Sequence, residues 1–192
     1  MSLRYRQHLT AGRLLQLTVT HRPTTMAIEL HLPDGTLAVR GDASVGGTPT
    51  APFGPALERP RRERLEATPE GLAGRDLGAI EFDFDGERDL AFLTRLDPDD
   101  PFRRLRVAHP AWLAGGVNAL IAQSVAIPPQ RWKHAGTEVR SLRPIPPGAR
   151  IRLVGRVDRL FGGGSQRFAD IAAVALADGS PAMTFVCTTV YG

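Results

Sequence analysis

Residues 110–125 constrain the fold of this chain most, because the segment is apolar on nearly every side. Pro110 is well placed in the first turn of a helix, and the spacing of the large apolar residues predicts a helix over the whole segment. The large residues surround a stripe of small ones, which are Ala114, Gly115, Gly116, Ala119 and Ala122. A helix of this kind is expected to be wrapped by other structure and closely approached along the small residues.

Alternating apolar residues predict three strands before this helix, at residues 13–20, 26–32 and 36–45. A Pro-Asp-Gly turn joins the last two strands, and connections this short indicate an antiparallel meander. Residues 46–76 are rich in proline, glycine and arginine, which predicts a long connector on the surface.

A strand around residues 79–84 follows the connector, and Asp85 is a suitable N-cap for a short helix at 87–95. The sequence DPDDP must end that helix, since the residue before a proline avoids helical geometry. Four more strands are predicted after the central helix, at residues 131–142, 149–160, 168–176 and 182–191. Arginines alternate with apolar residues in the second of these, so we expect an antiparallel sheet with one exposed face.

Residues 11–45 and 147–190 resemble each other. Each segment opens with a glycine and continues with an alternating strand, a second strand, an Asp-Gly turn and a third strand. Chance similarity between two meanders is the alternative, because these features are common in β proteins. We interpret the likeness as a partial duplication. The predicted organisation is a three-stranded partial repeat at 1–46, a connector at 47–76 and a main domain at 77–192.

Composition argues against several classes of function. The net charge is only +4, and the arginines are scattered except in RPRRER and RRLR, with few aromatic residues between them, so nucleic-acid binding is not favoured. Cys187 is the only cysteine, which excludes an intrachain disulfide and fits a cytoplasmic protein. The first twenty residues lack the apolar core of a signal peptide, and no unbroken apolar run of about 20 residues predicts a membrane span.

Four segments together resemble a known family. They are AIEFDFDGERDLAFLTRLDPDDPFR, VAHPAWLAGGVNALI, GTEVRSLRPIPPGARIRLVGRVDRL and RFADIAAVALADGSPAMTFVCTTV. In this order they are similar to MaoC-like enoyl-CoA hydratases and dehydratases, which have the hot-dog fold, an α+β fold with an antiparallel sheet wrapped around a central helix. The resemblance runs from Gly78 to the C-terminus and includes RPIPPGARIRL, which hot-dog thioesterases share. It implies that residues 1–46 belong to a degenerate double hot-dog, where they extend the sheet or occupy part of the place of a second protomer.

MaoC-like hydratases activate water with an aspartate and a histidine in a Gly-Asp-x-Asn-Pro-x-His loop, while backbone amides polarise the thioester carbonyl. Alignment of residues 100–101 with the Asn-Pro pair places Arg103 at the histidine position and Asp97 or Asp99 at the aspartate position. Arginine stays protonated and cannot act as a base near neutral pH. His109 begins the central helix soon after this acidic loop, so the resemblance implies Asp97, Asp99 and His109 as the acid/base set. A histidine that only caps the helix is the alternative.

The N-terminal amides of the central helix are expected near the thioester. Asn118 lies about two turns into this apolar helix, where an unpaired amide would cost roughly 1 to 3 kcal/mol. It therefore needs a partner, such as sheet backbone or Gln123, or a ligand, and we expect it to orient the substrate. The other residues expected to bind substrate are Trp112, Ala114, Gly115, His134 and Arg103. For His134, a surface or interface position is the alternative.

These residues and the resemblance predict an acyl-thioester hydratase or dehydratase of fatty acid metabolism that acts on acyl-CoA or on an acyl-carrier protein. Replacement of the motif histidine keeps two alternatives open. One is a hot-dog acyl-CoA thioesterase in which an acidic residue activates water, and the other is a non-catalytic acyl-binding subunit of a heteromer. We expect no cofactor and no metal ion. We also expect a cytoplasmic homodimer or higher homo-oligomer with neither a nucleic-acid nor a membrane partner.

Overall fold

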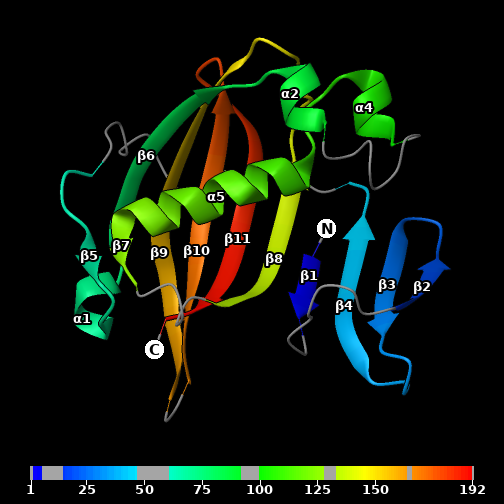
Figure 1. Ribbon diagram of the computed structural model, residues 1–192, viewed down its shortest axis with the longest axis horizontal. Coiled ribbons are helices and arrows are strands. Elements are labelled where there is room, and N and C mark those ends of the chain that lie inside the picture. Colours follow the sequence, from blue (N-terminus) through cyan, green and yellow to red (C-terminus); the bar gives the residue numbers. More distant parts are fainter. Residues whose placement is uncertain are drawn as a thin grey trace.

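The computed structural model describes residues 2–5, 15–46, 61–91, 100–127, 133–163 and 166–191. Nine strands in these ranges form one antiparallel sheet in the order β2-β3-β4-β1-β8-β11-β10-β9-β6 (Figure 1). They are β1 (Ser2–Tyr5), β2 (Gln16–His21), β3 (Thr25–His31), β4 (Leu37–Ser44), β6 (Asp76–Asp83), β8 (Lys133–Ser141), β9 (Arg150–Gly163), β10 (Gln166–Ala177) and β11 (Ser180–Val190). A short parallel pair joins β5 (Leu65–Glu66) to β7 (Val125–Ala126). The helices are α1 (Pro69–Leu72), α2 (Gly86–Leu90), α4 (Pro101–Leu105) and α5 (Pro110–Ser124).

Helix α5 is the predicted central helix, and it lies across one face of the sheet (Figure 1). Its buried side chains include Leu113, Val117 and Leu120, which pack into the main hydrophobic core with residues of β9, β10 and β11. Burial of each such side chain contributes about 1.5 to 3 kcal/mol. At the end of the helix, the Ser124 hydroxyl lies 2.6 Å from the carbonyl oxygen of Leu77, which ties α5 to β6. Packing and this contact fix the position of the helix.

One side of α5 is exposed, which corrects the expectation that the helix is wrapped all round. The exposed residues on this side are Gly115, Ala119 and Ala122. Their exposure costs little free energy, because such small residues present little apolar surface to water. The expected close approach occurs at Gly116, where an added Cβ atom would lie 2.6 Å from Cδ1 of Leu153. Small residues therefore let α5 touch β9 on one side and leave it uncovered on another.

The first four strands repeat the pairing of the last four. β1 pairs with β4, β4 with β3 and β3 with β2, just as β8 pairs with β11, β11 with β10 and β10 with β9. An antiparallel ladder between β1 and β8 joins the two sets, with Leu3 opposite Thr137. The N-terminal strands thus extend the sheet. The three predicted strands are present and β1 adds a fourth, while the division into repeat, connector and main domain stays a prediction.

The predicted connector is not wholly a surface segment. Residues 61–75 contain β5 and α1, and Leu65 and Leu72 are buried in the main core. Isolated leucines in a polar segment gave no periodic signal that could reveal this. Asp85 is the N-cap of α2, as predicted, and its carboxylate accepts hydrogen bonds from the backbone N–H groups of Glu87 and Arg88. Among the described residues, no helix combines the length and the apolar character needed to cross a bilayer.

The contact between α5 and β9 can be tested with two glycine variants. Alanine favours a helix over glycine by about 0.8 to 1.0 kcal/mol. Gly115→Ala should gain this amount, because an added Cβ there would meet no atom within 4 Å. Gly116→Ala should not show this gain in stability, because the added Cβ would overlap with the side chain of the buried Leu153. Denaturant unfolding should therefore rank Gly115→Ala above wild type and above Gly116→Ala, and equal stabilisation by both changes would contradict the close approach.

Candidate functional site

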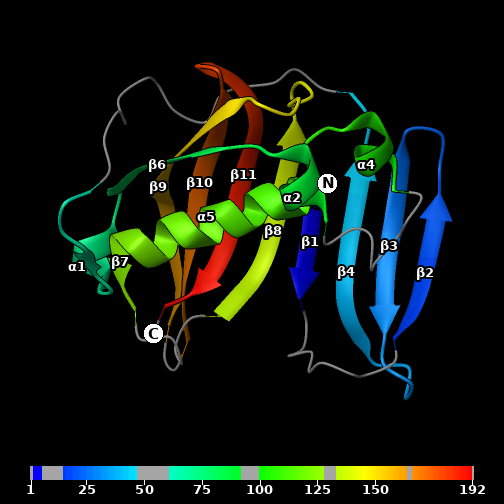
Figure 2. The same ribbon diagram turned by 45° about the horizontal axis from the view of Figure 1, so that its top comes forward.

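A cavity of about 700 Å³ opens where the two sets of strands meet, and we call it the seam cavity. Residues 42–46 at the end of β4 and 138–141 of β8 line it. Phe102 of α4 and the first residues of α5 complete the lining. Figure 2 shows α4 and the start of α5 near these neighbouring strands. The seam cavity therefore receives side chains from both halves of the sheet and from the N-terminus of the central helix.

His109 caps α5 with its own ring. Its Nδ1 accepts a hydrogen bond from the backbone N–H of Ala111 at 3.0 Å. Its carbonyl oxygen accepts bonds from the N–H groups of Trp112 at 3.1 Å and Leu113 at 3.4 Å. Because Nδ1 is the acceptor, the neutral ring carries its proton on Nε2. His109 is thus a helix cap that also presents a fixed N–H donor.

These bonds engage the backbone amides that were expected to polarise a thioester. Pro110 has no N–H, that of Ala111 binds the His109 ring, and that of Trp112 binds the His109 carbonyl. The first amides of α5 thus take part in capping the helix, and their position near a thioester stays a prediction.

Asp100 is the carboxylate that lies beside His109. Its Oδ1 accepts hydrogen bonds from the backbone N–H groups of Phe102 at 2.8 Å and Arg103 at 3.2 Å, so Asp100 is the N-cap of α4. Its Oδ2 lies 3.9 Å from Nε2 of His109, and the side chains are 13% and 20% exposed. The Phe102 ring packs edge-on against the His109 ring at 4.7 Å between centroids. Two helix caps therefore hold a carboxylate and an imidazole side by side.

Burial lowers the pKa of His109, and the carboxylate of Asp100 opposes this shift. Protonation of Nδ1 would also break the cap, because a protonated Nδ1 cannot accept the N–H of Ala111. The His109 ring is therefore neutral near pH 7, with its Nε2–H intact. The carboxylate of Asp100 is therefore the candidate base that lies beside this donor.

Two of the three predicted acid/base residues, Asp97 and Asp99, lie outside the described residues. Arg103, at the position of the family's histidine, is exposed on α4. Asp100 falls at the family's asparagine position, so the resemblance did not place it in the acid/base set. An Asp-Pro pair before a polar segment is nonetheless a typical N-cap signal, and it could have located this carboxylate.

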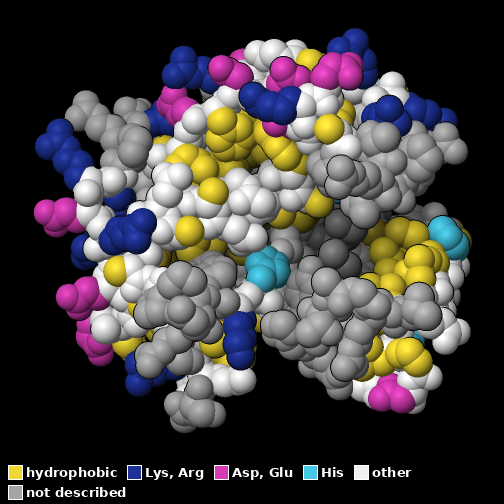
Figure 3. Space-filling model, in the orientation of Figure 1, with side chains coloured by type: hydrophobic (Ala, Val, Ile, Leu, Met, Phe, Trp, Pro, Cys, Tyr) yellow, Lys and Arg dark blue, Asp and Glu magenta, His cyan; other side chains and the backbone are white. Residues whose placement is uncertain are grey.

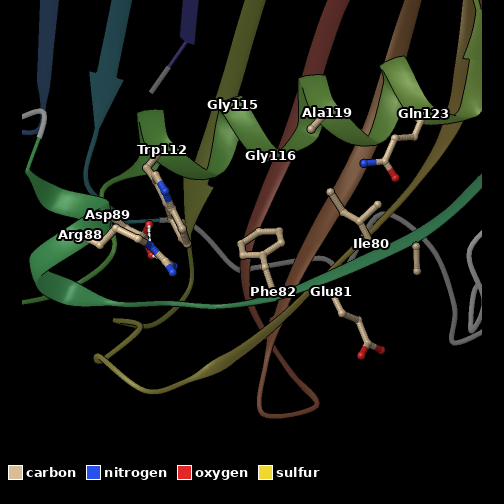
Figure 4. A pocket seen from close by; sticks show the side chains of 11 residues that line it. Ile80, Glu81, Phe82, Arg88, Asp89, Trp112, Gly115, Gly116, Ala119 and Gln123 are labelled. Atoms are coloured by element: carbon tan, nitrogen blue, oxygen red, sulfur yellow. Dashed lines mark hydrogen bonds and ion pairs between the residues drawn. The ribbon is translucent and has the colours of Figure 1, made fainter.

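Trp112 and Gly115 line a different cavity, also of about 700 Å³, between α5 and β6. Figure 4 shows the rings of Trp112 and Phe82 pointing toward one another, and they meet edge to face at 5.3 Å between centroids. Arg88 and Asp89 of α2 lie at one end of this cavity, joined by two hydrogen bonds of 2.8 Å. The lining of the seam cavity therefore does not include Trp112 and Gly115.

Asn118 has the unpaired amide that sequence analysis anticipated. Its Oδ1 is buried and has no hydrogen-bond partner among the described residues. Gln123, the partner suggested from the sequence, lines the cavity beside β6 instead. Ala114 is half-buried and packs against the main core. Asn118 is thus a predicted substrate-binding residue of α5 whose side-chain oxygen has no hydrogen-bond donor among the described residues.

His134 lies on β8 with its Nε2 2.6 Å from Oγ1 of Thr137, and burial lowers the His134 pKa. Oγ1 of Thr137 also lies 4.0 Å from Sγ of Cys187. Burial raises the pKa of Cys187 to about 11, so the thiol stays protonated near neutral pH and is a poor nucleophile. Among the described residues, no group of three or more histidine, cysteine or acidic side chains could hold a metal ion.

Comparison with solved structures identifies the fold. A MaoC-like dehydratase from Rhodospirillum rubrum matches 64% of this chain and 94% of its own, with a TM-score of 0.51 at 20% identity. A protein from Lactobacillus plantarum, provisionally named an oleoyl thioesterase, matches 99% of this chain and 73% of its own, with a TM-score of 0.60 at 9% identity. This chain has the hot-dog fold. The expected α+β architecture is thus confirmed, and the resemblance to MaoC-like proteins holds at the level of the fold.

A third structure, the peroxisomal multifunctional enzyme type 2 from Drosophila melanogaster, matches 97% of this hot-dog chain with a TM-score of 0.54 at 17% identity. The match spans 36% of that larger protein. No protein-family model matches the sequence, and no curated protein matches it.

The cap formed by His109 should make stability depend on pH. The unfolded ring titrates near pH 6.5, and the folded pKa is lower, so the neutral cap stabilises the fold above pH 6.5 and this contribution is lost as the pH falls toward the folded pKa. Asparagine is an equally good cap that does not titrate. Because burial lowers the pKa of His109, the unfolding free energy of wild type, measured relative to His109→Asn, should fall between pH 8 and pH 5. A difference that does not change with pH would contradict the cap geometry.

Proposed function

We propose that this hot-dog protein processes acyl thioesters, carried by CoA or by an acyl-carrier protein, in the seam cavity. The observation that carries the proposal is the pairing of the Asp100 carboxylate with the Nε2–H of His109, 3.9 Å apart at the start of α5. A carboxylate can take a proton from water, while a fixed N–H beside it can stabilise the oxyanion that develops on a thioester carbonyl. The structure neighbours named as dehydratase and thioesterase support the same substrate class.

Hydration of an enoyl thioester is the reaction we favour. Asp100, with Asp97 and Asp99 of the same loop as further candidates, accepts a proton from water as the water oxygen bonds to the β-carbon. The electron pair of the double bond moves toward the thioester oxygen, where the Nε2–H of His109 stabilises the negative charge. The α-carbon then takes up the proton, and the reverse sequence is dehydration. Both helix caps preorganise the reacting groups, which lowers the cost of reaching the transition state.

The predicted substrate contacts keep their roles in this proposal. The buried Oδ1 of Asn118 would accept a hydrogen bond from an N–H or hydroxyl of the substrate, which its lack of a protein partner favours. Arg103 is exposed on α4, where its guanidinium would pair with phosphates of the carrier. Ala114 and His134 would contact the rest of the thioester, whereas Trp112 and Gly115 could do so only from the second cavity, between α5 and β6. Cytoplasmic residence and independence of cofactors and metal ions stay predictions from the sequence.

Thioester hydrolysis is the second candidate, and one observation favours it. The Lactobacillus plantarum protein provisionally named a thioesterase matches nearly the whole chain, N-terminal strands included. The same two residues would serve: the carboxylate would activate water for attack on the carbonyl carbon, and His109 would stabilise the tetrahedral oxyanion. The products would be a carboxylic acid and a free thiol.

Two assays separate these reactions. Addition of water removes the conjugated absorbance of short and medium enoyl-CoAs, whereas hydrolysis releases a thiol that a reagent detects. We expect Asp100→Asn to lower kcat by about 10²- to 10⁴-fold and His109→Asn by about 10²- to 10³-fold. Asparagine keeps each helix cap, so both variants should fold. Asp97→Asn and Asp99→Asn in the same assays test the remaining members of the set.

Asp85→Asn is the matched control, because Asp85 caps α2 with the same pair of backbone bonds but is not the carboxylate beside His109. It should leave turnover unchanged. Unchanged turnover in both Asp100→Asn and His109→Asn would contradict the site. No activity in either assay, together with binding of acyl-CoA by wild type, would favour a non-catalytic acyl-binding subunit.

Asn118→Ala tests whether the buried amide serves the substrate or the fold. Alanine removes the unpaired oxygen and is the better helix former, so Tm should rise or stay unchanged. Loss of one substrate hydrogen bond, worth about 1 to 1.5 kcal/mol, should raise KM roughly tenfold. A lower Tm with unchanged KM would show that the amide is structural.

A further inference from the structure

The two edges of the nine-stranded sheet differ in chemistry. β6 forms one edge and carries Asp76, Glu81 and Asp83, with an irregular register at Asp76 and Gly78. Acidic side chains and a bulge are devices that keep a sheet edge from pairing with another chain. Glu81 is further held by the Arg150 guanidinium at 2.6 Å. This edge is protected against a second copy, because like charges would face each other.

β2 forms the other edge and has none of these devices. Its sequence, QLTVTH, contains no proline and no acidic or basic residue other than His21, and every residue is exposed. Leu17 is 59% and Val19 39% exposed. In the symmetric half of the sheet, the strand that corresponds to β2 is β9, and β9 has β6 on its outer side. The equivalent side of β2 has no strand among the described residues.

Backbone geometry shows which groups β2 offers. The N–H of Arg22 donates to the carbonyl of Thr25 at 2.8 Å, and the β2–β3 ladder continues in register from this pair. Residues of an antiparallel strand alternate between facing the partner and facing away, so the even-numbered residues of β2 bond to β3. The N–H and C=O groups of Leu17, Val19 and His21 therefore point to the outer edge. An edge with such groups is a template for another strand.

The side chains of Leu17 and Val19 share the face of the sheet on which α5 lies. Leu17 is opposite Leu30, and Val19 is opposite Ile28, so these four side chains form one apolar patch. Figure 3 shows hydrophobic side chains gathered over these strands. Addition of a strand at the edge would extend this patch and cover the exposed part of Leu17 and Val19.

We propose that β2 pairs antiparallel with β2 of a second copy of this chain. A two-fold axis through Thr18 places Leu17 of each copy opposite Val19 of the partner subunit, and Thr18 opposite Thr18 of the partner subunit. This register matches the outward N–H and C=O groups of both strands and joins their apolar patches. Apolar and Thr–Thr cross-strand pairs stabilise an antiparallel sheet. The pairing does not depend on the reaction in the seam cavity, and the β1–β8 seam stays within each chain.

Cysteine crosslinking tests the register. Thr18 faces its own copy as a non-hydrogen-bonded pair with Cα atoms about 4.5 Å apart, within the limit of about 7 Å for a disulfide. Thr18→Cys should give a disulfide-linked dimer under mild oxidation. Thr20→Cys is the matched control, because Thr20 lies on the same face but about 13 Å from its own copy. Cys187 is fully buried and stays out of the reaction.

Val19→Pro tests the edge itself. Proline removes an N–H that points outward and leaves the bonds between β2 and β3 in place. The variant should keep its circular dichroism spectrum and sediment as a monomer, whereas wild type sediments as a dimer. A monomeric wild type, a Val19→Pro dimer or equal crosslinking at positions 18 and 20 would each overturn the proposal.

Discussion

The structure depends on the burial of one face of α5 against the sheet. Leu113, Val117 and Leu120 fill the space above β9, β10 and β11, and Gly116 lets the helix approach Leu153 so closely that a Cβ atom would overlap. Since the helix can neither slide nor rotate without opening this contact, the position of its first residue is fixed. The start of α5, with His109 and Pro110, lines the seam cavity, so the geometry of the candidate site depends on the position of this helix.

Helix capping then supplies the chemistry. Asp100 and His109 lie side by side where α4 and α5 begin, and each caps its helix by accepting hydrogen bonds from backbone N–H groups of the first turn. The cap on α5 selects the Nε2–H tautomer and disfavours the charged ring, so in the proposed mechanism the histidine is a donor and the carboxylate is the base. The roles of an acid/base pair are thus set by backbone hydrogen bonds that the fold needs in any case. The seam between the two sets of strands adds a cavity in which these groups can meet a ligand.

Much of the fold could be predicted from the sequence, because it rests on periodicity. Residues 110–125 were expected as the central helix, the strands on both sides were expected from alternation, and Asp85 was expected as an N-cap. The strand β1 was missed because four residues carry too short a pattern. The exposed side of α5 was missed because glycine and alanine give the same apolar signal whether buried or not.

The site was harder to predict than the fold. His109 was selected because it follows the acidic loop at the start of the central helix, and Asn118 because a polar group in an apolar segment needs a partner. Asp100 was left out of the acid/base set because the alignment gave it the family's asparagine position, although the short distance in sequence to His109 allowed the two residues to face each other. The sequence also could not show that the N–H of Ala111 is bound by the His109 ring, because this bond depends on the orientation of the ring.

The most direct test of the account is the ¹⁵N NMR spectrum of the His109 ring, recorded near pH 7.5 with and without a non-hydrolysable acyl-CoA thioether. The account predicts a neutral ring protonated at Nε2, assigned by comparison with His109→Asn, and a shift of the Nε2 resonance when the ligand binds. A ring protonated at Nδ1, or an Nε2 resonance that does not respond to saturating ligand, would contradict it.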